Sequence, residues 1–354
     1  MGFEELLTRW DGEQVVIHHD RPTEAWMLIG IHDTTLGPAM GGTRLTSYAS
    51  PADALDDVLR LAEAMTWKQA AAELPYGGGK AVIAVPAVPA RGSEERRALL
   101  LRYAELVESL HGTYVTAADM NTGEADMDTL GERTSHVLGR STANGGSGDP
   151  GAATALGVFH GIRATVRRAF GDGALEGRSV LVQGLGSVGS RLAGHLHDAG
   201  ASLLLADVDA ERATTLADEL GAKVVRADDV IGTECDVFAP CATGKVLSRD
   251  TIPELRCRTV AGAANNQLAT PEDGDLLRDA GVLFAPDFVV NAGGVIHLAG
   301  RETLGWDDAT TADKLEGIGD RLLRIFDRAE REGLSPAAAA DRMARERVAG
   351  AQGE

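Results

Sequence analysis

The sequence predicts an α/β protein of two domains. Its 354 residues are more than one hydrophobic core usually needs, and the length suits two domains. Short β-rich runs alternate with amphipathic helical patterns along most of the chain, as in proteins with largely parallel sheets. The Gly-rich stretch 144–151 is the clearest shift in composition, and we expect the domain boundary and a hinge there.

Composition excludes several classes of protein. A formal net charge of −19 and a pI near 4.9 disfavour nucleic acid and anionic membranes as partners. The three cysteines, Cys235, Cys241 and Cys257, lack C-x-x-C spacing and predict neither a disulfide framework nor a zinc site. The N-terminus lacks an apolar signal core, and no apolar run has membrane-spanning length. We therefore expect a cytoplasmic protein with a small-molecule substrate.

The N-terminal half begins with two β-rich runs around a polar turn in residues 14–33, which predict a hairpin. Segment 36–44 contains the pair Gly41-Gly42 and is predicted to be a turn. The two glycines would let the backbone approach a ligand closely, but a tight turn without a ligand is the better interpretation of this segment alone. Ser50 and Pro51 begin an amphipathic helix that ends before Pro75. A strand at 81–85, a helix at 94–110 and a strand at 114–116 are then predicted.

Two lysines stand out, because the chain has only five Lys among its 34 basic residues. Lys68 belongs to the predicted helix, and Lys80 directly follows three glycines. Arg cannot release its proton, whereas a desolvated Lys can become neutral and act as a base. The alternative is a solvated Lys after a flexible turn. Asp119 follows a predicted strand, where open sheets place catalytic groups, although a turn or cap residue is an equal alternative.

Two other interpretations fail on spacing. A phosphate-binding P-loop around Lys80 needs Gly at position 74 and Ser or Thr at position 81, and the chain has Leu74 and Ala81 there. The second interpretation is that Asp126 and Asp128 are metal ligands. They are two residues apart at a predicted helix start, so they face different sides and are better explained as charges that cap the helix. We expect no metal site.

The second half carries a dinucleotide fingerprint. A β-run is followed by Gly184, Gly186 and Gly189 in G-x-G-x-x-G order, then by a helical run and a second β-run that ends in Asp207. The glycines let a pyrophosphate approach the helix N-terminus. Asp207 would accept hydrogen bonds from the adenosine ribose and repel a 2′-phosphate, which favours NAD over NADP. The alternative is a Gly-rich turn in an unrelated α/β protein.

The rest of the chain continues this alternation of strands and helices. Further short strands are predicted, followed by two helical patterns at 310–332 and 335–348. The strands fall at 222–225, 237–239, 259–263 and 282–285.

Segments spread over most of the chain resemble the amino-acid dehydrogenases of the glutamate, leucine, phenylalanine and valine family, and most closely its actinobacterial phenylalanine dehydrogenases. The segments are 37–44, 65–68, 75–83, 118–122, 125–130, 184–189, 239–242, 261–266 and 285–294. The resemblance implies a substrate and oligomerisation domain over 1–147, joined by C-terminal helices from about 325 to 354. It also implies an NAD-binding domain of Rossmann type over 148–324, and a homo-oligomer.

The resemblance implies reversible oxidative deamination of an L-amino acid to a 2-oxo acid and ammonia. Lys68 would hold the substrate carboxylate, Lys80 would be the general base and Asp119 would shuttle the amine proton. The implied substrate residues also include Met40, Gly41, Ala117, Asn265, Asn291, Val295 and Leu298. The implied cofactor residues are Thr154, Gly184, Gly186, Ser187, Val188, Gly189, Asp207, Cys241, Ala242 and Asn265.

The side-chain pocket decides the substrate. Met40 stands where glutamate-specific relatives carry Lys, so a second substrate carboxylate would be buried without a partner. Met40 and Val295 are larger than in phenylalanine enzymes and favour leucine or valine, whereas the chain as a whole favours phenylalanine, which we place slightly ahead. Two rival hypotheses are an oxidoreductase for other 2-oxo or 2-hydroxy acids and a non-catalytic NAD-binding sensor.

Overall fold

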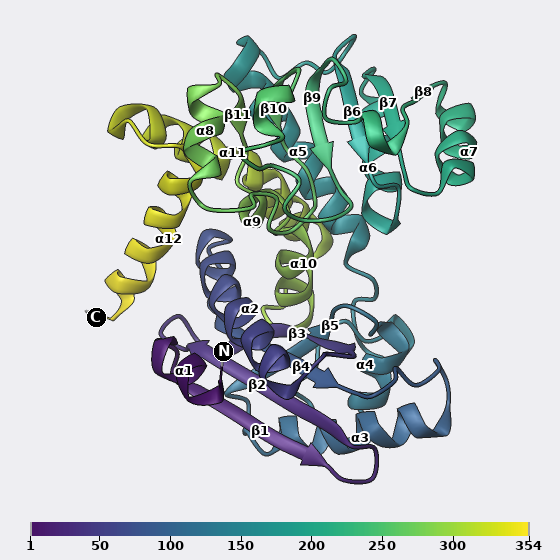
Figure 1. Ribbon diagram of the computed structural model, residues 1–354, viewed down its shortest axis with the longest axis vertical. Helices are drawn as coiled ribbons and strands as arrows, with labels where there is room; N and C mark the ends of the chain where they lie inside the picture. Colours follow the sequence, from purple (N-terminus) through teal and green to yellow (C-terminus); the bar gives the residue numbers. More distant parts are fainter. Residues whose placement is uncertain (1, 353–354) are drawn as a thin grey trace. The chain divides into compact units, whose positions relative to one another are not determined.

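In a computed structural model that describes residues 2–352, the chain divides into two compact units. The first unit holds the chain up to Asp149, Leu298–Gly305 and the chain from Ala344. The second unit holds Pro150–His297 and Trp306–Met343. Each unit is built around one β-sheet with helices packed against it (Figure 1), so the predicted two-domain α/β fold is confirmed.

The sheet of the first unit has five strands. Their order across the sheet is β1 (Gln14–Asp20), β2 (Ala25–Asp33), β4 (Gly77–Ala84), β3 (Ala39–Thr46) and β5 (Tyr114–Ala118). β1 and β2 form the predicted hairpin, and β2 is antiparallel to β4. β3 lies between β4 and β5 and is parallel to both. Residues on these three strands can therefore meet on one face of the sheet.

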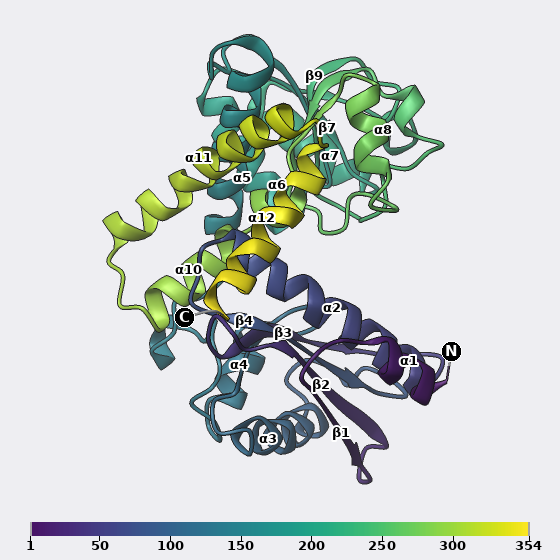
Figure 2. The same cartoon turned by 90° about the vertical axis from the view of Figure 1, so that its left-hand side faces the viewer.

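Helices cover both faces of this sheet. α1 (Phe3–Arg9) and α2 (Pro51–Ala71) lie on one face, and α3 (Glu94–Glu108) and α4 (Glu124–Leu130) lie on the other (Figure 2). α2 begins as predicted, because the Ser50 side chain accepts a hydrogen bond from the Asp53 N–H and Pro51 is the first helical residue. Its apolar side packs Leu55 and Val58 against Val82 of β4.

The turn expected at 36–44 is wrong over most of its length, because Ala39–Thr46 is the buried strand β3. Glycines are poor strand formers, but here they permit close packing. A Cβ on Gly41 would lie 1.7 Å from the carbonyl oxygen of Gly79. The Gly pair thus serves the contact between neighbouring strands rather than a turn.

The sheet of the second unit is entirely parallel. Its order is β11 (Leu283–Phe284), β10 (Cys257–Val260), β9 (Cys235–Pro240), β6 (Ser179–Gln183), β7 (Ser202–Ala206) and β8 (Lys223–Val224). The strand order reverses between β6 and β9. Such a switch point is where open α/β sheets bind ligands, beyond the carboxyl ends of the strands.

In the second unit, the long helix α11 (Asp308–Glu332) packs on α5 (Gly151–Phe170), with Ile318 against Gly157 and Leu322 against Gly161. This contact keeps α11 in the second unit, whereas the sequence led us to expect the chain from about 325 in the first. Residues 353 and 354 of that segment lie outside the described residues. The helices are α5 (Gly151–Phe170), α6 (Ser187–Asp198), α7 (Ala210–Leu220), α8 (Asp273–Asp279), α9 (Asp287–Val290) and α11 (Asp308–Glu332).

Two further helices, α10 (Gly293–Glu302) and α12 (Pro336–Ala351), have residues in both units. Short 3₁₀ helices span Thr142–Asn144, Ala227–Asp229 and Ile252–Glu254. Within residues 2–352, no helix is long and apolar enough to cross a membrane.

Candidate active site

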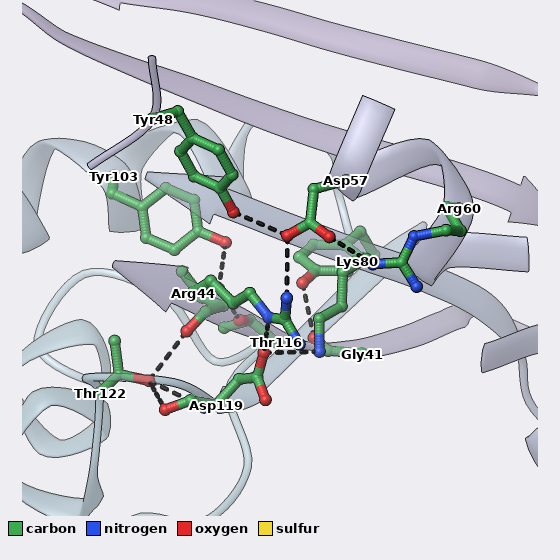
Figure 3. A network of polar contacts seen from close by, with 12 residues as sticks. Gly41, Arg44, Tyr48, Asp57, Arg60, Lys80, Tyr103, Thr116, Asp119 and Thr122 are labelled. Atoms are coloured by element: carbon green, nitrogen blue, oxygen red, sulfur yellow. Dashed lines mark hydrogen bonds and ion pairs between the residues drawn. The ribbon is translucent and has the colours of Figure 1, made fainter. Parts of the chain in front are cut away.

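Lys80, which is buried, and Asp119, which is partly exposed, form an ion pair in the first unit. Lys80 lies within β4 and is 7% exposed, and Asp119 directly follows β5. The Nζ of Lys80 lies 2.9 Å from Oδ2 of Asp119 (Figure 3). The predicted strand before Asp119 is therefore present, and the two residues that sequence reasoning chose for proton chemistry are in contact.

Glycines bring the surrounding backbone close to this pair. A Cβ on Gly78 would lie 2.0 Å from Oγ1 of Thr66, so only glycine lets α2 approach β4 here. Lys68 is two residues further along α2, in its last turn, and is partly exposed. The Gly-rich stretch before Lys80 is thus a buried strand, and not the flexible turn that would leave Lys80 in solvent.

The backbone at Asp119 is fixed by Thr122. The Asp119 N–H donates to Oγ1 of Thr122 at 2.8 Å, and the Thr122 hydroxyl donates to the carbonyl oxygen of Thr43 at 2.9 Å. Asn121 between them has φ 61°, in the left-handed region. The loop after β5 is consequently tied to β3, and the Asp119 carboxylate is held beside Lys80.

The electrostatics of the pair suit proton transfer. Burial lowers the pKa of the Lys80 ammonium, and the opposing attraction of Asp119 does not cancel this effect. Burial raises the pKa of Asp119, but the charges of Lys80 and Arg44 outweigh it and bring the pKa below its usual value. Asp119 is therefore an anion at neutral pH, and Lys80 is moved towards the neutral, basic form.

Sequence reasoning missed a second layer of charges around the pair. Arg44 of β3 donates from Nε to Oδ2 of Asp119 at 2.7 Å and from Nη1 to Oδ2 of Asp57 at 2.9 Å (Figure 3). Tyr48 and Arg60 also donate to Asp57. The available signal was the position of Arg44 directly after the Gly41-Gly42 pair and Thr43, which the interpretation as a turn concealed.

The residues expected to line the side-chain pocket are divided between the units. Met40, Gly41, Ala117 and Leu298 are buried in the first unit, whereas Val295 is partly exposed in the second. Met40 is paired with Val115 and Gly42 with Ala117, so Met40 and Ala117 point to the same face of the sheet. Lys80 points to that face too, because α2 packs on it through Gly78 and Val82.

The predicted dinucleotide loop lies at the switch point of the second unit. Gly184 has φ 90°, and a Cβ on Gly189 would lie 1.9 Å from the carbonyl oxygen of Gly184. A Cβ on Gly186 would meet nothing within 4 Å. Ser187 and Val188 begin α6 directly after it. The loop therefore places the N-terminus of α6 beside open space at Gly186, which fits a pyrophosphate.

The Asp207 side chain, directly after β7, stabilises this loop through hydrogen bonds. It accepts hydrogen bonds from the N–H groups of Leu185 at 2.6 Å and Asp209 at 2.9 Å, and Arg212 lies 3.6 Å from its Oδ1. Burial raises the pKa of Asp207, but these donors outweigh it and lower the pKa overall. Each carboxylate oxygen keeps a second lone pair, so Asp207 can still accept from ribose hydroxyls.

The remaining predicted residues of the second unit surround the same sheet edge. Asn291 donates from Nδ2 to Oδ1 of Asn265 at 2.7 Å, which orients the exposed Asn265 amide. Thr154 of α5 donates to the carbonyl oxygen of Pro150 at 3.0 Å. Cys241 and Ala242 follow β9, and burial raises the pKa of the Cys241 thiol to about 12.

Lys245 follows in the same loop. It is exposed and has φ 60°, a conformation that favours glycine. Within residues 2–352, no group of three or more His, Cys, Asp or Glu side chains is arranged to hold a metal ion.

Comparison with known proteins gives the family. Residues 20–136 match the family described as Glu/Leu/Phe/Val dehydrogenase, dimerisation domain. Residues 145–209 and 204–354 match Glutamate/Leucine/Phenylalanine/Valine dehydrogenase.

Individual relatives match over nearly the whole chain. A leucine dehydrogenase of Thermoactinomyces intermedius is 43% identical over 97% of this chain and 93% of its own length. A valine dehydrogenase of Streptomyces coelicolor is 45% identical over 96% and 93%. The crystal structure of L-tryptophan dehydrogenase from Nostoc punctiforme has a TM-score of 0.83 and 38% identity, and the match covers 99% of this chain and 100% of that one.

Proposed function

The chain belongs to the Glu/Leu/Phe/Val dehydrogenase family and is an amino-acid dehydrogenase, and we propose that its substrates are aliphatic L-amino acids such as leucine and valine. In the proposed reaction, an L-amino acid, NAD⁺ and water give a 2-oxo acid, ammonia, NADH and a proton. The observation that carries the chemistry is the contact between the buried Lys80 and Asp119.

Lys68 and Lys80 have different proposed roles, which are substrate binding for Lys68 and proton transfer for Lys80. A substrate carboxylate needs a fixed positive partner, and Lys68 in the last turn of α2 is the proposed one. Lys80 is more deeply buried, so it more readily becomes neutral. Neutral Lys80 would take a proton from the water that attacks the imine carbon of the oxidised substrate.

Asp119 would act on the substrate nitrogen. Its carboxylate takes a proton from the substrate ammonium, so that the nitrogen lone pair can form the imine as hydride leaves the α-carbon. It returns a proton to the nitrogen when ammonia departs. The 2.9 Å contact with Lys80 allows protons to pass between the two side chains within the buried site.

The cofactor of this family is a pyridine nucleotide, and we propose NAD for this chain. When bound, the nicotinamide supplies the hydride acceptor. Gly186 and the N-terminus of α6 would hold the pyrophosphate, and Asp207 would accept from the ribose hydroxyls and repel a 2′-phosphate.

The substrate proposal changes the order of the two candidates given by the sequence. The relatives described above are named for leucine, valine and tryptophan, and not for phenylalanine. Met40 is 1% exposed, so a large side chain occupies a position that the family resemblance assigns to the substrate pocket. Both observations favour leucine and valine over phenylalanine.

We further propose a homo-oligomer in which the β1–β2 hairpin takes part. The matching family domain is described as a dimerisation domain, and a solved relative from Thermus thermophilus is a hetero-hexamer. Within residues 2–352, β1 pairs only with β2, and it exposes Ile17, so its outer edge can receive another strand. A monomeric mass in solution would contradict this proposal.

The test is an absorbance assay of NADH formation with leucine, valine, phenylalanine, tryptophan and glutamate, repeated with the Lys80→Ala variant. We expect turnover with leucine and valine, a strict requirement for ammonia in the reverse direction, and loss of turnover in Lys80→Ala. Reduction of 2-oxo acids without ammonia would favour the hydroxy-acid alternative. Binding of NAD without any turnover would favour a sensor.

A further inference from the structure

We propose that Arg44 is a positioning residue for the pair of Lys80 and Asp119, and that Asp57 and Tyr48 hold Arg44 in this position. The inference rests on the catalytic roles proposed above for Lys80 and Asp119. The proposed role of Arg44 is to let Lys80 and Asp119 perform separate proton-transfer roles although they are in contact.

Arg44 and Lys80 both bind the same carboxylate oxygen of Asp119. Arg44 Nε lies 2.7 Å from Oδ2 of Asp119, and Lys80 Nζ lies 2.9 Å from that oxygen. Among the described residues, no contact reaches the other oxygen, Oδ1, and the Asp119 side chain is 27% exposed. Oδ2 is therefore held by both cations, and Oδ1 is the oxygen that we assign to the substrate ammonium.

Arg44 is itself fixed from the opposite side. Its Nη1 donates to Oδ2 of Asp57 at 2.9 Å, and the Tyr48 hydroxyl donates to the same oxygen at 2.7 Å. Arg60 holds the other Asp57 oxygen at 2.6 Å. A planar guanidinium bound by carboxylates on two edges loses its rotational freedom. Asp57 belongs to α2, so the helix that carries Lys68 also orients Arg44.

The permanent charge of Arg44 matters when Lys80 gives up its proton. Neutral Lys80 no longer balances the charge of Asp119, and even a partly buried carboxylate without a partner is costly. Arg44 does not titrate in this range, so Asp119 stays paired in both protonation states of Lys80. Without Arg44, the two residues would share one proton as a coupled pair, and neither role would be cleanly filled.

The charged groups that face Lys80 come from three elements. Asp119 follows β5, Arg44 lies on β3 and Asp57 lies on α2, and on β2 the residue paired with Lys80 is Gly30, which has no side chain. Burial lowers the pKa of Lys80, Asp119 raises it, and Arg44 lowers it again. Loss of the Arg44 charge would therefore let Lys80 keep its proton to a higher pH.

The decisive variant is Arg44→Gln, with turnover measured against pH. We expect the acid limb of the kcat profile to move to higher pH, so that turnover on that limb is lower than in the wild type at the same pH. The KM for the amino acid should change little, because Lys68 holds the carboxylate. Arg44→Lys should restore the position of the limb while kcat stays lowered, since a Lys cannot bridge Asp119 and Asp57.

A matched control is Arg102→Gln. Arg102 holds Asp20 through two hydrogen bonds of 2.6 and 2.8 Å in the same unit, without touching Lys80 or Asp119. This variant should lose stability but keep the wild-type pH profile. An Arg44→Gln protein with an unchanged acid limb and kcat would overturn the proposal.

If Arg44→Gln does not fold, Tyr48→Phe decides the question, because it removes one hydrogen bond to Asp57 and little else. A smaller shift of the limb in the same direction supports the proposal, and an unchanged limb overturns it. Failure of the proposed function is recognised separately. In that case Lys80→Ala would keep its turnover, and the Arg44 variants would have the same pH profile as the wild type.

Discussion

Lys80 and Asp119 belong to elements separated by β3, yet Nζ of Lys80 lies 2.9 Å from Oδ2 of Asp119. The two side chains meet because β4, β3 and β5 are parallel neighbours and because Gly42, between them on β3, has no side chain to intervene. A Cβ on Gly42 would lie 2.9 Å from that of Asp119. The Gly pair of β3 is thus part of the architecture of the site.

Asp119→Asn should abolish most turnover while the protein still folds. The amide cannot take the amine proton, and general acid–base catalysis of this kind is worth about 10²–10⁴-fold in rate. The measurement is kcat with leucine and NAD. Asp33→Asn, a substitution at the end of β2 in the same unit, is the control and should keep its activity.

The pH dependence of turnover should report on Lys80. Its pKa is lowered from 10.5, chiefly by burial, so the neutral base gains population at a lower pH than for a free Lys. The pKa of Asp119 is also lowered, so Asp119 stays ionised and does not limit the rate near neutral pH. We expect activity to rise with pH along one limb below 10.5.

The acid limb of the Asp119→Asn variant should move in the opposite direction from that of Arg44→Gln. Asp119 is the main group that raises the pKa of Lys80, so its removal should let Lys80 lose the proton more easily. The residual activity of Asp119→Asn should therefore have an acid limb at lower pH than the wild type. A shift to higher pH would mean that the limb belongs to another group.

Local signals in the sequence predicted much of this molecule. The hairpin of residues 14–33, the helix capped by Ser50 and the loop around Gly186 each depend on neighbours in the sequence, and each is present. Lys80 was recognisable as a rare Lys directly after three glycines, and Asp119 was recognisable as an acidic residue at the end of a predicted strand. The contact between them was not predicted, because the family resemblance implied only that both residues act in the same reaction.

Non-local contacts were out of reach. β3 contains two glycines and is a strand because β4 and β5 pair with both of its edges, which overrides its weak intrinsic preference. Arg44 was missed for the same reason, since its partners Asp57 and Asp119 are 13 and 75 residues away. The packing of α11 on α5 likewise depends on small residues, Gly157 and Gly161, far away in the chain.

Gly186 and Gly189 should respond differently to substitution by Ala. A Cβ on Gly186 meets no protein atom within 4 Å, whereas a Cβ on Gly189 would lie 1.9 Å from the carbonyl oxygen of Gly184. Gly186→Ala should keep the melting temperature but weaken NAD binding, because the methyl group enters the space for the pyrophosphate. Gly189→Ala should lower the melting temperature even without NAD.

The measurements are thermal unfolding and titration calorimetry with NAD. Gly232→Ala serves as the control, because its Cβ would also meet nothing within 4 Å and it lies away from the dinucleotide loop. It should change neither quantity. Unchanged NAD affinity in Gly186→Ala would exclude this loop as the pyrophosphate site.

Met40→Ala should change which amino acid is preferred. Met40 is 1% exposed on the face of β3 that also carries Arg44, and its truncation leaves space for a larger substrate side chain. We expect the ratio of kcat/KM for phenylalanine to that for leucine to rise by at least about 10–200-fold, the usual range for one methylene group in an apolar pocket. Met27→Ala is the matched control, since Met27 is equally buried in the same unit but packs in the core with α3 and α4. Both variants should lose about 2–5 kcal/mol of stability, so only a change of substrate ratio confined to Met40→Ala identifies the pocket. An equal change in both, or in neither, would place the substrate side chain elsewhere.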